Sequence, residues 1–197
     1  MSEGGDLASA ETVLPLAPNS VAAFFADVDR LLRLNPLLAI ERWAPEGPGR
    51  FRLVARNESN EQLIDTPVDI EEDERGLTLR YASGLKQATR LRVEPAPEGT
   101  RLFVTEHYPR IEDAQDPRVV EVDRSLVPWV AALRRHLLSR ARWGRLPLIF
   151  PVWSWWSEGI MLSMAPRNRR IVRLIVWLSA IEFAVFIGMV VVLRLAA

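Results

Sequence analysis

Cysteine is absent from this chain of 197 residues, which excludes disulfides, thiol nucleophiles and thiolate metal sites together. The only histidines are His107 and His136, too few for a histidine-rich metal site and without a partner at ligand spacing. No serine lies in a nucleophile-elbow context, and no glycine-rich loop follows an expected strand to hold a phosphate. We therefore assign no catalytic residues, no metal and no cofactor, and nothing in the sequence demands an enzyme.

The chain also lacks a net charge, because 25 acidic residues balance 25 basic ones. The distribution is uneven: from Arg134 onward, Glu158 and Glu182 are the only acidic residues. A basic region that ends in a long apolar segment suits anionic lipid headgroups better than nucleic acid, so no nucleic-acid partner is expected. The opening residues 1–10 have neither the basic start nor the apolar core of a secretory signal, and we expect them to be disordered.

One long apolar segment is present, the 20 residues 174–193, in which Ser179, Glu182 and Gly188 are the exceptions. A helix of that length spans ~30 Å, the hydrocarbon thickness of a bilayer. Its 13 Leu, Ile, Val and Phe residues together favour insertion by roughly 5 kcal/mol, against ~2.5–3.5 kcal/mol for one charged group at mid-helix. We therefore predict a transmembrane helix.

Arginines flanking this segment give its orientation. Arg167, Arg169, Arg170 and Arg173 precede it, whereas Arg194 alone follows it. Lys and Arg accumulate on the cytoplasmic side of membrane helices. We expect residues 167–197 to be a basic flank and a single-pass helix of the cell inner membrane, with the N-terminal domain in the cytoplasm.

Glu182 lies near the middle of the predicted span, where carboxylates are uncommon and usually face a protein partner or a polar pathway. One hypothesis is a helix–helix contact, within a homo-oligomer or with another membrane subunit. The other is a lone glutamic acid that stays neutral because the rest of the helix is so apolar.

Residues 143–166 contain four of the seven tryptophans and are interrupted by Pro147 and Pro151. Tryptophan favours the headgroup level of a bilayer, since its ring is apolar and carries one N–H. A crossing here would also place the flanking arginines on the outer side. We therefore expect an interfacial segment in the membrane plane, with a re-entrant hairpin as the alternative. The expected membrane contacts are Trp143, Trp153, Trp155, Trp156 and Glu182.

Residues 11–142 predict a regular series of elements in one domain. A short strand at Glu11–Leu16 precedes two short helices, one from Ser20 through Asp27 with Asn19 or Ser20 as its cap, the other at Asp29–Leu34. Alternating residues between turn signals then predict the strands Leu38–Trp43, Arg50–Asn57, Gln62–Ile70, Leu77–Tyr81, Ala88–Glu94 and Arg101–Tyr108. Each has one polar face, which indicates an antiparallel sheet covered on one side. Pro67 indicates an edge strand or a bulge.

A long amphipathic helix is expected over Asp116–Arg142, because apolar residues follow one another at steps of three or four from Val119 to Leu137. Pro128 falls on the polar side, where we expect a kink rather than a break. Such a helix can lie along the concave face of a curved sheet.

This order of elements resembles the START-like (SRPBCC) superfamily of polyketide cyclases/dehydrases and lipid-transfer proteins. The resemblance rests on Glu11–Leu16, the helix pair from Ser20 to Pro36 and the amphipathic helix Asp116–Arg142; Leu34 stands where many members have tryptophan. It implies an α+β helix-grip fold, in which a curved antiparallel sheet of about seven strands surrounds a long helix.

The resemblance further implies a cavity between the sheet and the long helix that accepts an apolar molecule. Residues compatible with its lining are Phe51, Leu53, Leu79, Leu91, Val93, Leu126 and Val130. Asn57, Glu106 and Tyr108 share parity with inward residues on their strands. They would orient a ligand, or else lie at a solvated cavity mouth.

Three functions remain open. The favoured one is a membrane-anchored protein that binds or presents a hydrophobic ligand, such as a lipid, an isoprenoid or a quinone, at the cytoplasmic membrane face, where tethering raises the effective concentration. The second is an accessory subunit of a membrane complex, held through Glu182 and the tryptophan segment. The third is a cyclase- or dehydrase-type enzyme that uses Glu106 or Tyr108 as acid or base.

Overall fold

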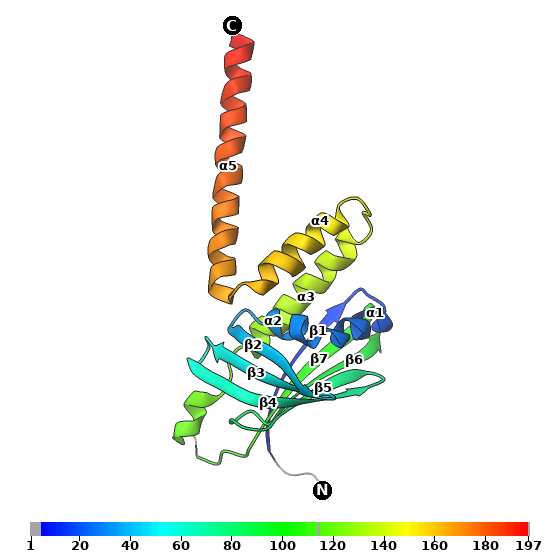
Figure 1. Cartoon of the computed structure of the whole chain (residues 1–197). Helices are drawn as coiled ribbons and strands as arrows, with labels where there is room; N and C mark the ends of the chain where they lie inside the picture. Colours follow the sequence, from blue (N-terminus) through cyan, green and yellow to red (C-terminus); the bar gives the residue numbers. More distant parts are fainter. Residues whose placement is uncertain (1–4, 114, 197) are drawn as a thin grey trace.

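The computed structural model describes residues 5–113 and 115–196 (Figure 1). Within these residues, one antiparallel sheet has the strand order β1-β7-β6-β5-β4-β3-β2. Its strands are β1 Asp6–Leu14, β2 Leu38–Gly47, β3 Arg50–Asn57, β4 Gln62–Asp73, β5 Gly76–Tyr81, β6 Ala88–Ala96 and β7 Gly99–Tyr108. The helices are α1 Pro18–Ala22, η1 Ala23–Ala26, α2 Val28–Arg33, η2 Pro117–Glu121, α3 Leu126–Trp143, α4 Phe150–Ser154, η3 Trp155–Met161 and α5 Pro166–Ala196. The predicted α+β helix-grip fold is confirmed.

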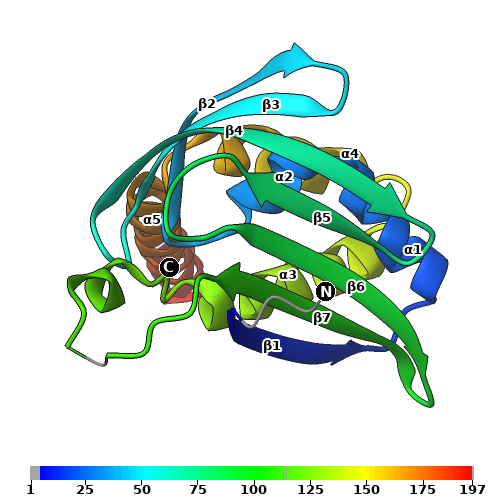
Figure 2. The same cartoon turned by 90° about the horizontal axis from the view of Figure 1, so that it is seen from below.

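The apolar residues that alternate along the strands pack against α3 and form the core. Leu79 of β5 and Leu91 of β6 are fully buried, as is Leu133 of α3. Trp129 of α3 is 2% exposed, and its Nε1 donates a hydrogen bond to the Leu31 carbonyl at 3.0 Å. Figure 2 shows the sheet curving around the helices that cover it. Protein side chains therefore occupy much of the space that the grip encloses.

The first strand is longer than expected. β1 starts at Asp6, so residues 6–10, which were expected to be disordered, pair with β7. Alternation explains the extension, since Ala8 and Ala10 pack against the core while their neighbours face outward. Residues 1–4 lie outside the described residues.

The cap predicted at Asn19 or Ser20 is wrong. Helix α1 has Ala17 as its N-cap and Pro18 at its first position, where a missing N–H costs nothing and the fixed φ of proline favours the helix. The side-chain cap belongs to the next helix, α2, in which Asp27 accepts from the backbone N–H of Arg30 at 3.0 Å.

The long helix is shorter than predicted. Residues Pro117–Glu121 form the separate 3-10 turn η2, and α3 starts only at Leu126. The Asp123 carboxylate accepts from the Ser125 N–H at 2.8 Å, a local bond that competes with helical hydrogen bonding. Pro128 consequently falls in the first turn of α3, where its missing N–H has no intrahelical partner to lose. The expected kink there is not needed.

The edge strand or bulge expected at Pro67 is wrong, because β4 lies between β3 and β5. The Pro67 carbonyl accepts from the Ala82 N–H at 3.0 Å, so its ring nitrogen also faces the β5 side. Regular pairing with β5 begins only at the next residue, Val68, opposite Tyr81. The missing N–H therefore falls where that ladder ends.

After α3 the chain turns and runs back along it as α4 and the π-helical η3 (Figure 1). Glu158 of η3 holds this segment against α2 and α3. Its carboxylate lies 3.2 Å from His136 Nε2, 3.3 Å from Arg30 Nη1 and within hydrogen-bond distance of Arg140. The segment containing the tryptophans thus forms a helical layer on α3.

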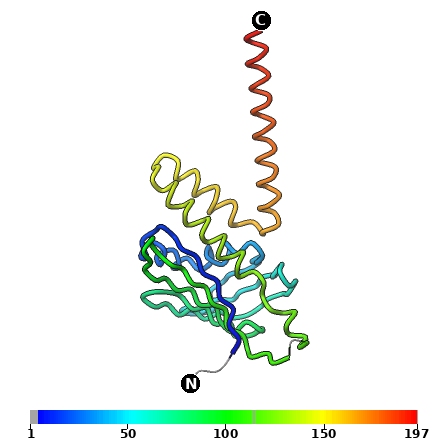
Figure 3. The backbone as a smooth tube through the Cα atoms, turned by 180° about the vertical axis from the view of Figure 1, so that it is seen from behind, coloured from blue at the N-terminus to red at the C-terminus, as the bar shows by residue number. Residues whose placement is uncertain are grey.

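Helix α5 projects away from the sheet and the other helices (Figures 1 and 3). In the described part of the chain it is the one helix long and apolar enough to cross a membrane, and none of its most apolar window, of mean hydropathy 2.4, is buried. It is therefore no part of this chain's core. Its first turns are fixed by Arg169, which donates to the carbonyls of Arg33, Leu162 and Met164.

Candidate functional site

A pocket of about 240 Å³ lies at one end of the sheet, between β4, the 83–86 loop that follows β5, and residues 121–123 before α3. Leu63, Ile64 and Leu85 give it an apolar side, and Leu63 is 76% exposed at its rim. Tyr81 and Tyr108 also contribute to its wall. The pocket joins an apolar entrance to a polar inner wall.

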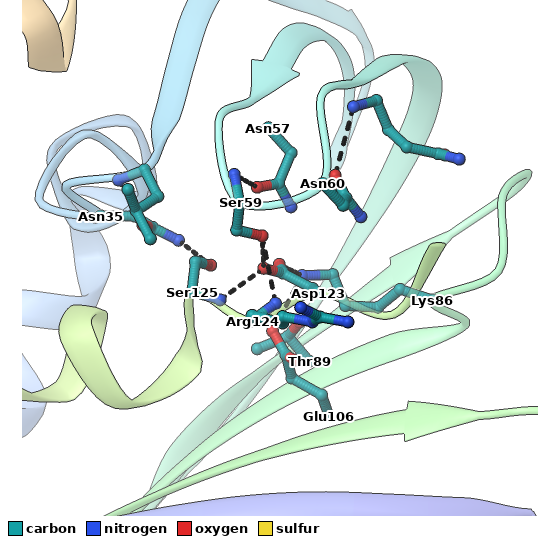
Figure 4. A network of polar contacts seen from close by, with 12 residues as sticks. Asn35, Asn57, Ser59, Asn60, Lys86, Thr89, Glu106, Asp123, Arg124 and Ser125 are labelled. Carbon is teal, nitrogen blue, oxygen red and sulfur yellow. Dashed lines mark hydrogen bonds and ion pairs between the residues drawn. The ribbon is translucent and has the colours of Figure 1, made fainter. Parts of the chain in front are cut away.

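Lys86 is the centre of that polar wall (Figure 4). Its Nζ lies 2.8 Å from Glu106 Oε1 and 2.5 Å from Asp123 Oδ2. The Tyr108 hydroxyl donates to the other Glu106 oxygen, Oε2, at 2.7 Å. Glu106 is fully buried, and Asp123 and Tyr108 are 8% and 4% exposed. One ammonium therefore joins two carboxyl groups from β7 and from the segment before α3.

The proton positions follow from burial and from these partners. Burial alone lowers the pKa of Lys86, but Glu106, Tyr81 and Asp123 outweigh it, and its pKa is well above the ordinary value. Burial raises the pKa of Asp123, yet Lys86 and hydrogen-bond donors lower it well below the ordinary value. Burial and Glu106 both raise the pKa of Tyr108. At neutral pH the wall therefore contains the Lys86 ammonium, the Asp123 carboxylate and a protonated Tyr108, whose O–H donates to Glu106.

Amide side chains hold the mouth of the pocket in place. Asn60 Nδ2 donates to the Glu121 carbonyl at 2.6 Å, which ties the β3–β4 turn to η2. Asn57 is 2% exposed and accepts from the Ser59 N–H at 2.9 Å, and the Ser59 hydroxyl donates to Asp123 at 3.3 Å. The turn and the segment before α3 are therefore one hydrogen-bonded unit around the pocket (Figure 4).

Three polar residues selected from the sequence come together here. Asn57 and Tyr108 line the pocket, and Glu106 lies behind Tyr108 and Lys86. The burial of Glu106 and Tyr108 places them inside the grip rather than at a solvated mouth. Leu102 and Val104 are fully buried on the same face of β7, which settles the inward parity of this strand.

The apolar residues selected for the cavity lie elsewhere. The buried core holds Leu53, Leu79, Leu91, Val93, Leu126 and Val130, none of which lines this pocket. Phe51 stacks on Trp43 with ring centroids 4.8 Å apart, beside a different hollow near α2. Close packing of leucine and valine against α3 explains this, since it leaves the core little space for a guest.

Lys86 and Asp123 were missed in the sequence. Lys86 is the only lysine in the chain, and this was the one feature of the sequence that could have pointed to it. Asp123 was not selected because its segment was predicted to be part of the long helix. Within residues 5–113 and 115–196 no group of three or more His, Cys, Asp or Glu residues could hold a metal ion.

The tryptophans expected at a membrane lie mostly on the helical layer. Trp153 packs on His136 and Phe150, with ring centroids 5.6 and 5.8 Å apart. Trp155 is 62% exposed, while Trp143 and Trp156 are partly exposed. Glu182 is exposed on α5. Their contact with a membrane stays a prediction.

No family model matches this sequence, and no curated protein matches it either. Solved structures do match in fold. A START superfamily protein from Mycobacterium smegmatis aligns with a TM-score of 0.52 and 16% identity, over 69% of this chain and 99% of its own. The KanY protein gives 0.55 and 13%, over 68% and 98%. A protein from Thermus thermophilus gives 0.51 and 19%, over 68% and 98%.

These similarities establish a START-like fold and nothing finer, because all three identities are below 20%. The solved chains are covered almost completely, whereas about a third of this chain has no counterpart in them. Fold alone does not assign a function, which depends on the site.

Proposed function

We propose that this protein binds or presents a hydrophobic ligand with a polar end, such as a lipid, an isoprenoid or a quinone-like molecule, at the cytoplasmic face of the inner membrane. The observation that carries the proposal is the pocket's construction: an apolar rim at Leu63 leads to the Lys86 ammonium, which has three N–H groups and uses two of them on Glu106 and Asp123. A ligand oxygen would accept from the third N–H, while the apolar part of the ligand would run over the rim.

The size of the pocket limits what enters. Its volume of about 240 Å³ lies below the ~300–1,000 Å³ of most small-molecule sites. A ring or headgroup fits, whereas a long chain would extend along the exposed Leu63. The ligand is thus held by one end.

Anchoring by α5 is the second part of the proposal. The helix is long and apolar enough to span a bilayer, and the flanking arginines favour a cytoplasmic domain. Arg170 at its start pairs with Glu58, the neighbour of the pocket residue Asn57, at 2.9 Å. The pocket mouth would therefore stay near the membrane, the reservoir of such ligands, which raises their effective concentration.

Native mass spectrometry of the full chain, extracted in mild detergent, tests ligand binding. We expect a co-purifying hydrophobic molecule that is depleted in Leu63→Glu and retained in Leu7→Glu. Both leucines are exposed on strands, but only Leu63 lines the pocket. An empty wild-type chain, or equal depletion in the two variants, would contradict the proposal.

A second candidate function is an enzyme of the cyclase or dehydrase kind. It is favoured by the buried Tyr108–Glu106 pair, a phenol held 2.7 Å from a carboxyl oxygen beside the pocket. Tyr108 or Glu106 would act as acid or base toward a substrate that takes the place of their mutual hydrogen bond. Once a substrate is identified, turnover rates can be compared between wild type, Tyr108→Phe and Glu106→Gln. Rates that are unchanged in both variants would exclude this candidate.

A protein partner in the membrane is the third candidate. Glu182 is exposed within the apolar α5, where a carboxylate favours a helix–helix contact. We expect mild-detergent extracts to contain a homo-oligomer or a complex that Glu182→Leu disperses. A wild-type chain that runs as a lone monomer would count against this candidate.

A further inference from the structure

A second hollow, of about 310 Å³, lies where α3, η3 and the first turns of α5 meet. We propose that it binds the phosphate-bearing headgroup of an anionic phospholipid in the leaflet that α5 enters. This inference rests on the membrane anchoring in the proposed function, and is independent of any ligand in the Lys86 pocket. Figure 3 shows α5 rising from the end of η3.

The hollow is lined by positive charge. Arg135 comes from α3, and Arg169, Arg170 and Arg173 come from α5. Among the described residues, Arg170 alone of these four has a carboxylate within 4.0 Å, that of Glu58. Arginine guanidinium groups bind phosphate oxygens through two parallel N–H bonds. The hollow therefore holds more cations than the protein itself neutralises.

Of the four arginines, Arg169 most favours a bound anion, because it is only 7% exposed. Three of its hydrogen bonds go to carbonyl oxygens, those of Met164, Leu162 and Arg33. Carbonyls satisfy N–H groups without cancelling the charge, and a guanidinium has five N–H groups in all. The remaining donors and the buried charge both favour an anionic ligand.

The other walls suit the rest of a phospholipid. Trp153 and Trp156 line the hollow, and tryptophan favours the headgroup level. Leu162, which is 6% exposed, and Leu34, which is 8% exposed, give it an apolar floor. Glycerol and the first methylene groups of an acyl chain can pack there. Free phosphate would use the arginines but not these surfaces.

With α5 spanning a bilayer, the hollow would lie at the level of the lipid phosphates. Arg173 directly precedes the apolar residues 174–193, and four residues of helix from Arg169 cover ~6 Å. Each headgroup layer of a bilayer is ~5–7 Å thick. With the apolar residues in the hydrocarbon, the guanidinium groups of α5 stand at phosphate level, and the positive end of the α5 dipole adds to them.

Native mass spectrometry of the full chain in non-ionic detergent, titrated with phosphatidylglycerol, phosphatidylcholine and inorganic phosphate, tests this site. We expect a one-to-one phosphatidylglycerol adduct that phosphatidylcholine and phosphate do not displace. The double variant Arg135→Gln/Arg173→Gln should weaken it at least about tenfold. The matched control Arg145→Gln/Arg167→Gln removes equal charge, from the α3–α4 turn and the first turn of α5, without touching the hollow, and should change affinity less than about threefold.

Equal weakening in the two double variants would overturn the proposal, since binding would then follow general surface charge. Equal binding of phosphatidylcholine, or displacement by phosphate at the same concentration, would also overturn it. Alkaline carbonate extraction of the full chain from membranes tests the anchoring by α5 separately. A chain that resists extraction but shows no preference for phosphatidylglycerol would refute this site alone, whereas an extracted chain would refute the anchoring.

Discussion

Arg170 Nη2 donates to Glu58 Oε2 at 2.9 Å and so joins the start of α5 to the β3–β4 turn, 112 residues earlier in the chain. The turn also forms the mouth of the Lys86 pocket through Asn57 and Asn60. Helix α5 and the pocket are therefore connected by one exposed ion pair. Arg169, the preceding residue, donates a part-buried hydrogen bond to the Arg33 carbonyl of α2.

We predict unequal effects from removing these two arginines. Arg170→Gln should lower the free energy of unfolding by about 1 kcal/mol or less, as exposed ion pairs do. Arg169→Gln should lower it by roughly 2–4 kcal/mol, because charged hydrogen bonds to three carbonyls are lost together. Urea unfolding in detergent measures both, and hydrogen exchange around residues 160–170 should rise only in Arg169→Gln. Equal costs would contradict the assigned geometry.

Lys86→Met should be among the most damaging single substitutions in the domain. It leaves the carboxyl groups of Glu106 and Asp123 buried side by side without their cation, and breaking a buried pair in this way typically costs about 3–5 kcal/mol. Gln87→Met is the matched control, since Gln87 is the exposed neighbour. Denaturant midpoints compare the two variants, and a cost below that of the control would show that the network contributes nothing to folding.

Asp123 should make stability depend on pH below neutrality. Its pKa is lowered in the folded state, because Lys86 and the hydrogen bonds it accepts outweigh burial, whereas the pKa of an unfolded aspartate is about 3.9. A lowered folded pKa contributes stability that is complete well above pH 4 and is lost as the pH falls below the unfolded value. The free-energy gap between wild type and Asp123→Asn should therefore narrow from pH 6 to pH 3. A gap that stays constant over this pH range would contradict the role assigned to the Lys86–Asp123 pair.

Glu158 should control the attachment of the α4–η3 layer. Its carboxylate pairs with Arg30 of α2 and with His136 and Arg140 of α3. Glu158→Gln should lower the free energy of unfolding by roughly 2–3 kcal/mol, since charged partners lose their counter-ion. It should also raise hydrogen exchange over residues 150–161 while β6 and β7 stay protected. Glu112→Gln, at an exposed pair with Arg110, is the control; exchange that rises uniformly would contradict local detachment.

Period-two alternation explains why the strands were predictable. Arg50–Asn57 was bounded correctly because a turn flanks it on each side and its apolar residues face inward. The long helix was overextended because Val119 and Val122 continue the spacing of α3 by coincidence. Residues 116–125 instead follow local side-chain bonds, such as that of Asp116 to Arg118, which a search for apolar periodicity does not detect.

The candidate site was only half visible in the sequence. Glu106 and Tyr108 could be selected because strand parity is a local property. Their cation could not, because Lys86 lies in a loop and Asp123 is 37 residues further on, and only the closed fold brings them together. The same holds for Glu158, which read as part of a membrane-surface segment but pairs with α2 and α3.

Trp129 has a broader consequence. Its indole lies against α2 and is only 2% exposed, so the chain's own side chains fill the space between the sheet and α3. The selectivity of the proposed ligand site would then depend on residues outside this core, such as Lys86 in the loop after β5 and Leu63 on β4. Replacing Trp129 by a smaller residue would open a new cavity in the core and would leave the Leu31 carbonyl without its indole donor.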